Sequence, residues 1–144
     1  TEVMSLAAII QKAAAMVEER PKVAGVYLNR LERGIKLQAD PTVIFAIQTK
    51  NKDFDTPIRR VLYKDLELDS PYNTYKYAGV PPAPIAMPDV SSIEAVLNAE
   101  RHDYLYFAAD IENPGYHKFA KSLSQHNRNA KAYQNWVNKQ KIYR

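Results

Sequence analysis

Tyr104-Leu105-Tyr106-Phe107-Ala108, Asn113-Pro114-Gly115 and Tyr116-His117-Lys118-Phe119-Ala120 form the stretch that decides the fold class. Aromatic residues favour a strand for the first segment. Proline and glycine in the second segment indicate a turn, so the third segment is predicted to return as the antiparallel partner strand. A small hairpin in a chain that is otherwise helical predicts a single α+β domain.

Helical spacing dominates the sequence before this hairpin. Apolar residues recur every three or four positions over residues 3–19, which predicts a first helix with an apolar stripe formed by Val3, Leu6, Ile10, Ala13 and Val17. Pro21 begins a second helix that Gly34 is expected to end. Asp40 followed by Pro41 reads as an N-cap and a first helical residue, which predicts a third helix over residues 42–48.

The remaining segments alternate between loops and short helices. Residues 59–66 are predicted to form a short helix, whereas the prolines and the glycine of residues 68–88 exclude regular structure there. Ser91-Ser92-Ile93-Glu94 matches a capping box, so residues 92–100 are expected to be helical. A last helix is predicted over residues 124–139, with an apolar side formed by Ala132, Tyr133 and Trp136.

Composition narrows the class of protein. The chain has 144 residues, of which 46% are hydrophobic and 25% charged, as is usual for one globular domain. It has no cysteine, which excludes disulfide scaffolds and thiolate metal sites. No apolar run approaches the ~20 residues that cross a bilayer. Because a helical pattern is already running at Thr1, we expect a fragment of a longer protein.

The basic residues bear on nucleic-acid binding. The net charge is +4, and the basic excess gathers late in the chain, in Lys118, Lys121, Arg128, Lys131, Lys139, Lys141 and Arg144. A solvated helix face explains these charges better than a nucleic-acid surface, because Tyr133 and Trp136 are expected in the core rather than stacked on bases. No nucleic-acid partner is therefore expected.

Two polar blocks stand out as candidate binding segments: Gln38-Ala39-Asp40-Pro41-Thr42-Val43 and Ser70-Pro71-Tyr72-Asn73-Thr74-Tyr75. Each places short polar side chains around a proline-fixed backbone, and the second adds tyrosine rings. Such loops suit a polar, extended ligand with many hydroxyl and amide groups, such as a glycan. Turn chemistry alone is the alternative, since Asn73 and Thr74 can close an Asx turn.

The histidines and two early glutamates carry weaker signals. His102, His117 and His126 match no metal-binding spacing, and each is expected to be structural; His102 is placed on a surface loop. Glu18 and Glu19, just before Pro21, are expected to be solvated. Neither a metal nor a cofactor is expected.

The order of several blocks resembles the endolytic murein transglycosylase family (MltG, YceG-like). The resemblance covers nearly the whole chain and rests on the following segments: Leu6-Ala7-Ala8-Ile9-Ile10, Val23-Ala24-Gly25-Val26-Tyr27-Leu28-Asn29-Arg30-Leu31, Leu37 to Val43, Ser70 to Tyr75, Gly79-Val80-Pro81-Pro82-Ala83-Pro84-Ile85, Tyr104 to Phe107, and His117-Lys118-Phe119. Ala83 departs from the family's usual glycine, so we expect that loop to follow a slightly different course.

The resemblance implies an enzyme that cleaves the MurNAc–GlcNAc bond of nascent peptidoglycan strands and leaves a 1,6-anhydro-MurNAc end. Family members are typically anchored to the inner membrane by one helix, with a small glycan-binding module before the catalytic domain. Residues 1–144 would then be the catalytic domain without either part: a soluble fragment of a protein on the periplasmic face of that membrane. Peptidoglycan strands are the expected partners, with peptidoglycan synthases beside them.

The mechanism makes one demand that this chain does not meet. One carboxylic acid must protonate the leaving oxygen and then, as a carboxylate, take the proton of the sugar's C6 hydroxyl. The family usually carries Glu-Lys-Glu on the first helix, and the second glutamate resembles the acid. This chain has Gln11-Lys12-Ala13, so Ala13 occupies the catalytic position and the chain is expected to be inactive. Either Ala13 replaces a glutamate by design or the member is naturally degenerate.

Other residues carry over as expected substrate contacts, namely Gln11, Gln38, Asp40, Tyr72, Asn73, Thr74, Tyr75 and His117. Asp40 is a poor replacement acid, because a capping carboxylate is held ionised. The alternative function, a glycan-binding domain that never cleaves, needs the same contacts without any acid.

Overall fold

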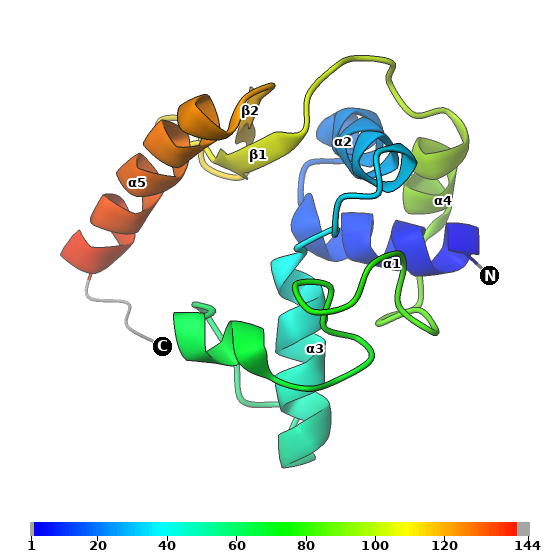
Figure 1. Cartoon of the computed structure of the whole chain (residues 1–144), viewed down its shortest axis with the longest axis vertical. Coiled ribbons are helices and arrows are strands. Elements are labelled where there is room, and N and C mark those ends of the chain that lie inside the picture. The colour runs from blue at the N-terminus through cyan, green and yellow to red at the C-terminus, as the bar shows by residue number, and fades with distance from the viewer. Residues whose placement is uncertain (1, 141–144) are drawn as a thin grey trace.

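The computed structural model describes residues 2–140, which fold into helices around one core and a two-stranded antiparallel sheet (Figure 1). This arrangement confirms the α+β prediction. In chain order, the elements are α1 (Glu2–Ala13), the 3₁₀ turn η1 (Val17–Glu19), α2 (Arg20–Glu32), α3 (Asp40–Asn51), the 3₁₀ turn η2 (Tyr63–Glu67), α4 (Val90–Leu97), β1 (Tyr106–Ala109), β2 (His117–Ala120) and α5 (Leu123–Lys139).

Helix α1 forms the centre of the core. It packs against α2, α3 and α4, so residues 5–10 are buried all round rather than along one stripe. Ile9 and Ile10 have no exposed surface. Burying side chains of this size stabilises the fold by about 1.5–3 kcal/mol each, which makes α1 the fixed support for whatever stands at its C-terminal end.

Helix α1 is shorter than the helix predicted over residues 3–19. It ends at Ala13, and the backbone is extended at Met16 before η1 begins. Val17, expected on the apolar stripe, is 54% exposed. Arg20 compensates for the end of the helix at this point. Its guanidinium donates from Nε to the Ala14 carbonyl oxygen at 2.9 Å, which satisfies a carbonyl that the helix end leaves without an intrahelical bond.

Helix α2 ends as predicted, whereas α3 begins differently. Gly34 has φ +69°, and the Ile35 amide donates to the Arg30 carbonyl at 2.8 Å, as in a glycine C-cap. In α3 the N-cap position is Ala39, and the Asp40 side chain makes no capping bond. The prediction that Asp40 caps this helix was therefore wrong, which frees its carboxylate for another partner.

The segment between α3 and the sheet is irregular over residues 68–88, as predicted. The short helix expected over residues 59–66 is the 3₁₀ turn Tyr63–Glu67. Helix α4 is capped by Asp89, whose carboxylate accepts the Ser92 amide at 2.8 Å. The prediction of a capping box that begins at Ser91 was wrong, because the N-cap of α4 is Asp89. The Asp89 carboxylate also forms an ion pair with Arg20.

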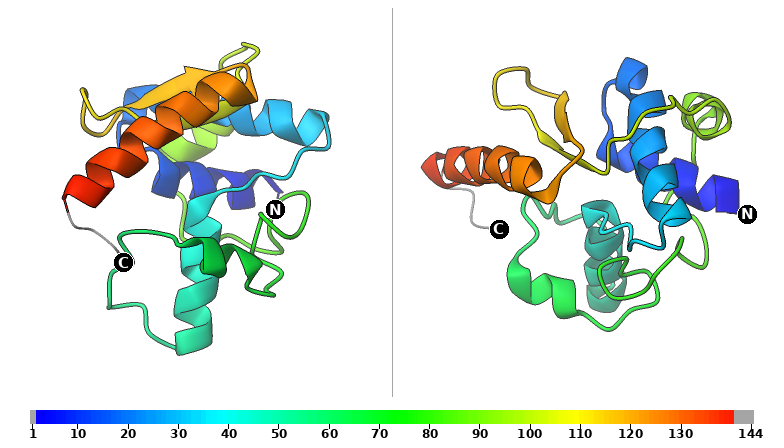
Figure 2. Two further views of the ribbon diagram at one scale, coloured as in Figure 1. Left: turned by 60° about the vertical axis from the view of Figure 1, so that its left-hand side comes forward. Right: turned by 45° about the horizontal axis from the view of Figure 1, so that its top comes forward.

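The hairpin pairs Tyr106 with Ala120 and Ala109 with His117, and Gly115 in the predicted turn has φ +90°. Helix α5 packs mainly on β1 and β2, so that hairpin and helix lie together at one side of the core (Figures 1 and 2). Its predicted apolar side was wrong: Trp136 is 40% exposed and stacks on Tyr133, while Val137 is the buried residue of α5.

No helix within residues 2–140 is both long and apolar enough to span a membrane. The same residues contain no group of histidine and carboxylate side chains that could hold a metal ion.

Candidate active-site cleft

A cleft with a volume of about 590 Å³ opens between two parts of the molecule. One wall comes from β1 and α5, the other from α3 and the segment around η2, and the inner end is formed by α2 and the C-terminal end of α1. Helix α5 faces α3 and η2 across this space (Figure 2). Its volume falls in the range of small-ligand sites. The residues that line the cleft include Ala13, Arg30, Gln38, Asp40, Tyr75, Phe107 and His117.

Ala13 lies half-buried at the inner end of this cleft, as the last residue of α1. Its methyl group offers no proton. A longer side chain at this position has room to enter the cleft, because the alanine lines it directly.

Asp40 lines the cleft at the start of α3 and accepts a hydrogen bond from the Tyr75 hydroxyl at 2.5 Å. The carboxyl is open to the solvent of the cleft, yet the surrounding protein desolvates it enough to raise its pKa; the Tyr75 bond opposes this shift without cancelling it. This direction is the opposite of that expected for a helix cap. The pair joins the two predicted polar blocks.

Gln38 also lines the cleft, next to the buried Arg30. The Arg30 guanidinium donates to Gln38 Oε1 at 3.2 Å, to the Leu105 carbonyl at 2.7 Å and to the Lys36 carbonyl at 2.9 Å. The backbone of Gln38 has φ +49°, a conformation that non-glycine residues seldom adopt. Arg30 thus fixes the amide of Gln38 while its own charge faces neutral acceptors.

Tyr72, Asn73 and Thr74 do not line the cleft. Asn73 is fully buried and donates from Nδ2 to the carbonyls of Leu66 and Leu68, while its Oδ1 accepts the Tyr75 amide. Thr74 is buried against Thr42 and accepts the Ala39 amide.

Tyr72 packs on Phe45, with ring centroids 4.9 Å apart. These three residues hold the Ser70–Tyr75 loop against α3, so that Tyr75 can reach Asp40.

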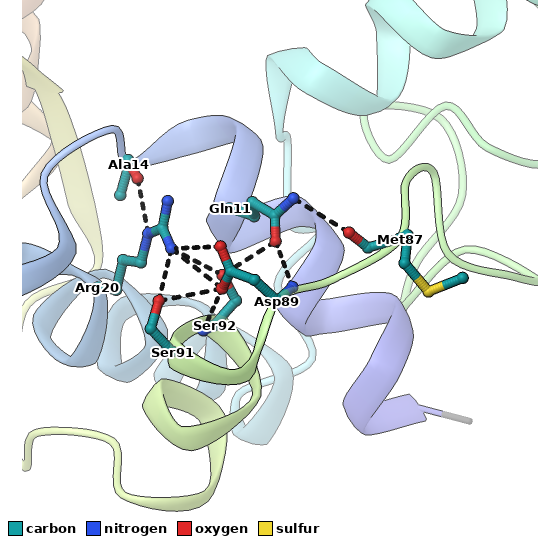
Figure 3. A network of polar contacts seen from close by, with 7 residues as sticks. All are labelled: Gln11, Ala14, Arg20, Met87, Asp89, Ser91 and Ser92. Atoms are coloured by element: carbon teal, nitrogen blue, oxygen red, sulfur yellow. Dashed lines mark hydrogen bonds and ion pairs between the residues drawn. The ribbon is translucent and has the colours of Figure 1, made fainter.

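Gln11 faces away from the cleft, into a polar network beside α4 (Figure 3). Its Nε2 donates to the Met87 carbonyl at 3.1 Å, and its Oε1 accepts the Asp89 amide at 2.6 Å. Asp89 in turn binds the Arg20 guanidinium at 3.1 Å. The network ties the end of α1 to the start of α4 and holds the Ala14 carbonyl in place.

His117 lines the cleft from β2 and pairs with Glu19. Glu19 accepts the His117 backbone amide at 2.9 Å and contacts Nδ1 at 2.7 Å. The expectation of a solvated Glu19 was wrong, because the hairpin covers it and leaves it only 9% exposed. Glu18, beside it, is exposed and accepts a bond from the Tyr116 hydroxyl.

The other histidines have different surroundings. His102 is half-buried rather than on the surface: its Nε2 contacts the Lys22 carbonyl at 2.8 Å and its Nδ1 accepts the Tyr104 amide at 3.1 Å. His126 lines the cleft and stacks on Tyr106, and its Nδ1 has no hydrogen-bond partner among residues 2–140. Burial lowers the pKa of His126.

Comparison with known proteins gives one consistent answer. The family model described as the YceG-like family matches residues 1–132. An endolytic murein transglycosylase of Bacillus subtilis is 45% identical over 132 residues, which cover 92% of this chain. The protein of the same name from Streptococcus pneumoniae D39 is 32% identical over 93% of the chain. This chain belongs to the YceG-like family.

A solved structure supports the same membership. The crystal structure of a YceG-like protein of Listeria monocytogenes superposes with a TM-score of 0.74 at 43% identity and covers 85% of this chain. The chain covers 34% of the Bacillus relative's length, 24% of the pneumococcal relative's and 38% of the Listeria chain.

Sequence reasoning on this YceG-like chain missed part of the cleft. Arg30 occupies the same helix face as Val23 and Val26, and a charged residue on an apolar face is a usable signal that was passed over. The contributions of Phe107 and Tyr133 depend on how the hairpin and α5 dock, which no local pattern shows.

Proposed function

We propose that residues 1–144 are the catalytic domain of an endolytic peptidoglycan lytic transglycosylase in which alanine stands at the position of the catalytic acid. The observation that carries the proposal is the position of Ala13, at the fixed end of α1 and on the wall of the cleft that also holds Asp40, Tyr75 and His117. Membership in a family whose curated relatives are named endolytic murein transglycosylase supports it.

The proposed substrate is a nascent peptidoglycan strand, cleaved at the MurNAc–GlcNAc bond with a 1,6-anhydro-MurNAc end. The cleft suits a sugar chain because its polar groups include an amide, a carboxyl, a phenol and an imidazole, from Gln38, Asp40, Tyr75 and His117. Lys12, Arg59 and Arg60 also line it, and these cations complement the carboxylates of peptidoglycan. In the longer protein, the domain would work on the periplasmic face of the inner membrane, beside peptidoglycan synthases.

Asp40 does not replace the missing acid in this proposal. Its raised pKa makes protonation easier than for a free aspartate, but the Tyr75 hydroxyl donates to it and stabilises the carboxylate. We assign Asp40 to binding a sugar and to stabilising positive charge at the anomeric carbon. As it stands, the chain binds glycan without cleaving it.

The test is the substitution Ala13→Glu. A carboxyl at residue 13 would be partly desolvated on the cleft wall, which raises its pKa and suits it to donate a proton. We expect the Ala13→Glu protein to release 1,6-anhydro-muropeptides from peptidoglycan, as detected by mass spectrometry, while the parent chain and an Ala13→Gln control release none.

Three results would overturn parts of the proposal. Anhydro products from the parent chain would show that another residue is the acid. A folded Ala13→Glu protein that binds glycan yet remains inert would favour the alternative function, a glycan-binding domain that never cleaves. Products with reducing rather than anhydro ends would make the enzyme a hydrolase.

A further inference from the structure

The Glu19–His117 pair is a second chemically competent group in the cleft. The two residues are far apart in sequence and come together because the hairpin folds over η1. The side chain of Glu19 is 11% exposed and that of His117 13%. An isolated carboxylate so far from water is costly, and here both of its oxygens are satisfied by one residue.

The contact with Glu19 favours one ring nitrogen of His117 as the site of the proton. An ionised carboxylate only accepts hydrogen bonds, so the 2.7 Å contact between Glu19 Oε1 and Nδ1 places a proton on Nδ1. In the neutral imidazole, Nε2 then holds a free lone pair. The second bond, from the His117 amide to Glu19 Oε2, prevents the carboxylate from rotating away.

The ring is also held in orientation by its neighbours. Phe107, which lines the cleft beside it, contacts the imidazole edge-on, with ring centroids 5.1 Å apart. Tyr116, the preceding residue, donates its hydroxyl to Glu18, so the hairpin is attached to η1 at two successive residues. His117 is thus an imidazole on the wall of the cleft whose orientation is held by Glu19 and Phe107.

The Glu19–His117 pair is linked through the backbone and Arg20 to the end of α1, where Ala13 stands at the proposed position of the acid. Glu19 lies six residues after Ala13, and Arg20 binds the Ala14 carbonyl on one side and Asp89 on the other (Figure 3). Both Ala13 and His117 line the same cleft. Of these two residues, only His117 has a side chain that can accept or donate a proton.

We infer that His117 is the general base of this cleft and that Glu19 is its positioning residue. In the reaction, the C6 hydroxyl of MurNAc gives its proton to Nε2 of His117, and its oxygen forms the bond to C1. The bond between C1 and the leaving oxygen breaks, and that oxygen takes a proton from the acid at residue 13. This division of labour differs from the expectation that one acid performs both transfers. It rests on the proposed function.

An activated substrate separates base from acid in the protein as it exists. In the 4-nitrophenyl β-glycoside of a peptidoglycan tetrasaccharide, with MurNAc carrying the nitrophenol, the leaving group departs as an anion and needs no proton. We expect the Ala13 chain to release nitrophenolate from it and to form the 1,6-anhydro sugar. His117→Gln should lower kcat by at least about 100-fold with KM little changed, since general bases contribute about 10²–10⁴-fold.

Glu19→Gln should give a smaller loss together with a spectroscopic change. Nitrogen-15 NMR of the imidazole should show the Nδ1–H tautomer in the parent and a mixture of tautomers in Glu19→Gln. Lys118→Gln is the matched control, since Lys118 is exposed on the same strand and does not line the cleft; it should behave as the parent.

Calorimetry with an unactivated peptidoglycan tetrasaccharide, run on every variant, shows which proposal fails. If the parent does not bind it, the proposed function fails and the inference fails with it. If the parent binds it but releases no nitrophenolate, or if folded His117→Gln releases as much, His117 is not the base. A product with a reducing end in place of the anhydro ring would overturn the C6 transfer.

Discussion

Asn73 and Gln38 belong to the two polar blocks, but the side chain of Asn73 binds backbone groups and that of Gln38 lines the cleft. Asn73 holds three backbone groups in a fully buried place, whereas Gln38 lines the cleft and is exposed. We expect Asn73→Ala to lower the free energy of unfolding by about 2–3 kcal/mol, because it empties a fully buried position and leaves two half-buried carbonyls without their donor. Urea denaturation measures this loss.

Gln38→Ala is the matched comparison. It should leave the stability within about 1 kcal/mol of the parent and weaken binding of a glycan oligomer by about 1–2 kcal/mol in calorimetry, since it removes a neutral polar contact. The assignment of the two residues would be reversed if Asn73→Ala were as stable as the parent and bound glycan more weakly.

Asp89 gives a prediction about pH at the same scale. Its bonds from the Ser92 amide and hydroxyl, helped by Ser91 and Arg20, lower its pKa to about 2. A lowered pKa means that the folded state favours the carboxylate, so this contribution to stability is present above the unfolded value near 4 and is lost as the pH falls towards 2. Asp89→Asn keeps an oxygen for the Ser92 amide but loses the charge.

We therefore expect Asp89→Asn to be less stable than the parent at pH 5 and to lose less stability than the parent between pH 4 and pH 2. Urea unfolding at a series of pH values tests both statements. Parallel pH profiles for the two proteins would show that the carboxylate of Asp89 is not linked to folding.

At the scale of elements, α2 depends on a glycine in its interior. A Cβ on Gly25 would lie 2.4 Å from the Glu100 carbonyl oxygen and 2.6 Å from His102 Nε2. The close approach lets the segment after α4 lie on α2, where the Glu100 amide donates to the Pro21 carbonyl at 3.0 Å. Gly25 is thus needed for packing rather than for a turn.

Gly25→Ala should lower the free energy of unfolding by about 1–3 kcal/mol, as overpacking does, despite the better helix propensity of alanine. Glu32→Ala, at an exposed position of the same helix, should change it by less than about 0.5 kcal/mol. Thermal unfolding of both variants tests this. A Gly25→Ala protein more stable than the parent would mean that the Glu100–His102 segment does not pack as described.

For the whole molecule, local patterns predicted most elements and missed the contacts between distant ones. Pro21, Gly34 and Gly115 marked boundaries correctly because proline and glycine act through their own backbone.

Asp40 was assigned to a cap because its neighbour is proline, but its partner Tyr75 lies in another loop. Glu19 was placed in solvent because nothing near it in sequence indicates the hairpin that covers it. Trp136 was predicted in the core from its hydrophobicity. It is exposed because few other elements pack against α5, which the sequence pattern does not indicate.

That isolation of α5 has a dynamic consequence. Among the elements, the hairpin makes the main contacts with α5, and Val137 is the buried residue of this helix. At its far end, the Arg60 guanidinium donates to Asn138 Oδ1 at 2.6 Å, which links the segment before η2 to α5. Elements with little buried surface open at low cost, so we expect α5 amides to exchange faster with deuterium than those of α1, and Asn138→Ala to speed their exchange further.

A glycan bound in the cleft would contact both walls and should slow this opening. If only the closed form binds, a peptidoglycan oligomer at ten times its Kd should slow α5 exchange by about tenfold. Thr49 and Lys50, at the exposed end of α3 and outside the cleft, serve as internal controls whose exchange should not change. Glycan binding proved by calorimetry with no protection of α5 would show that this helix is not a wall of the binding site, and that substrate is held by α1, α2 and α3 alone.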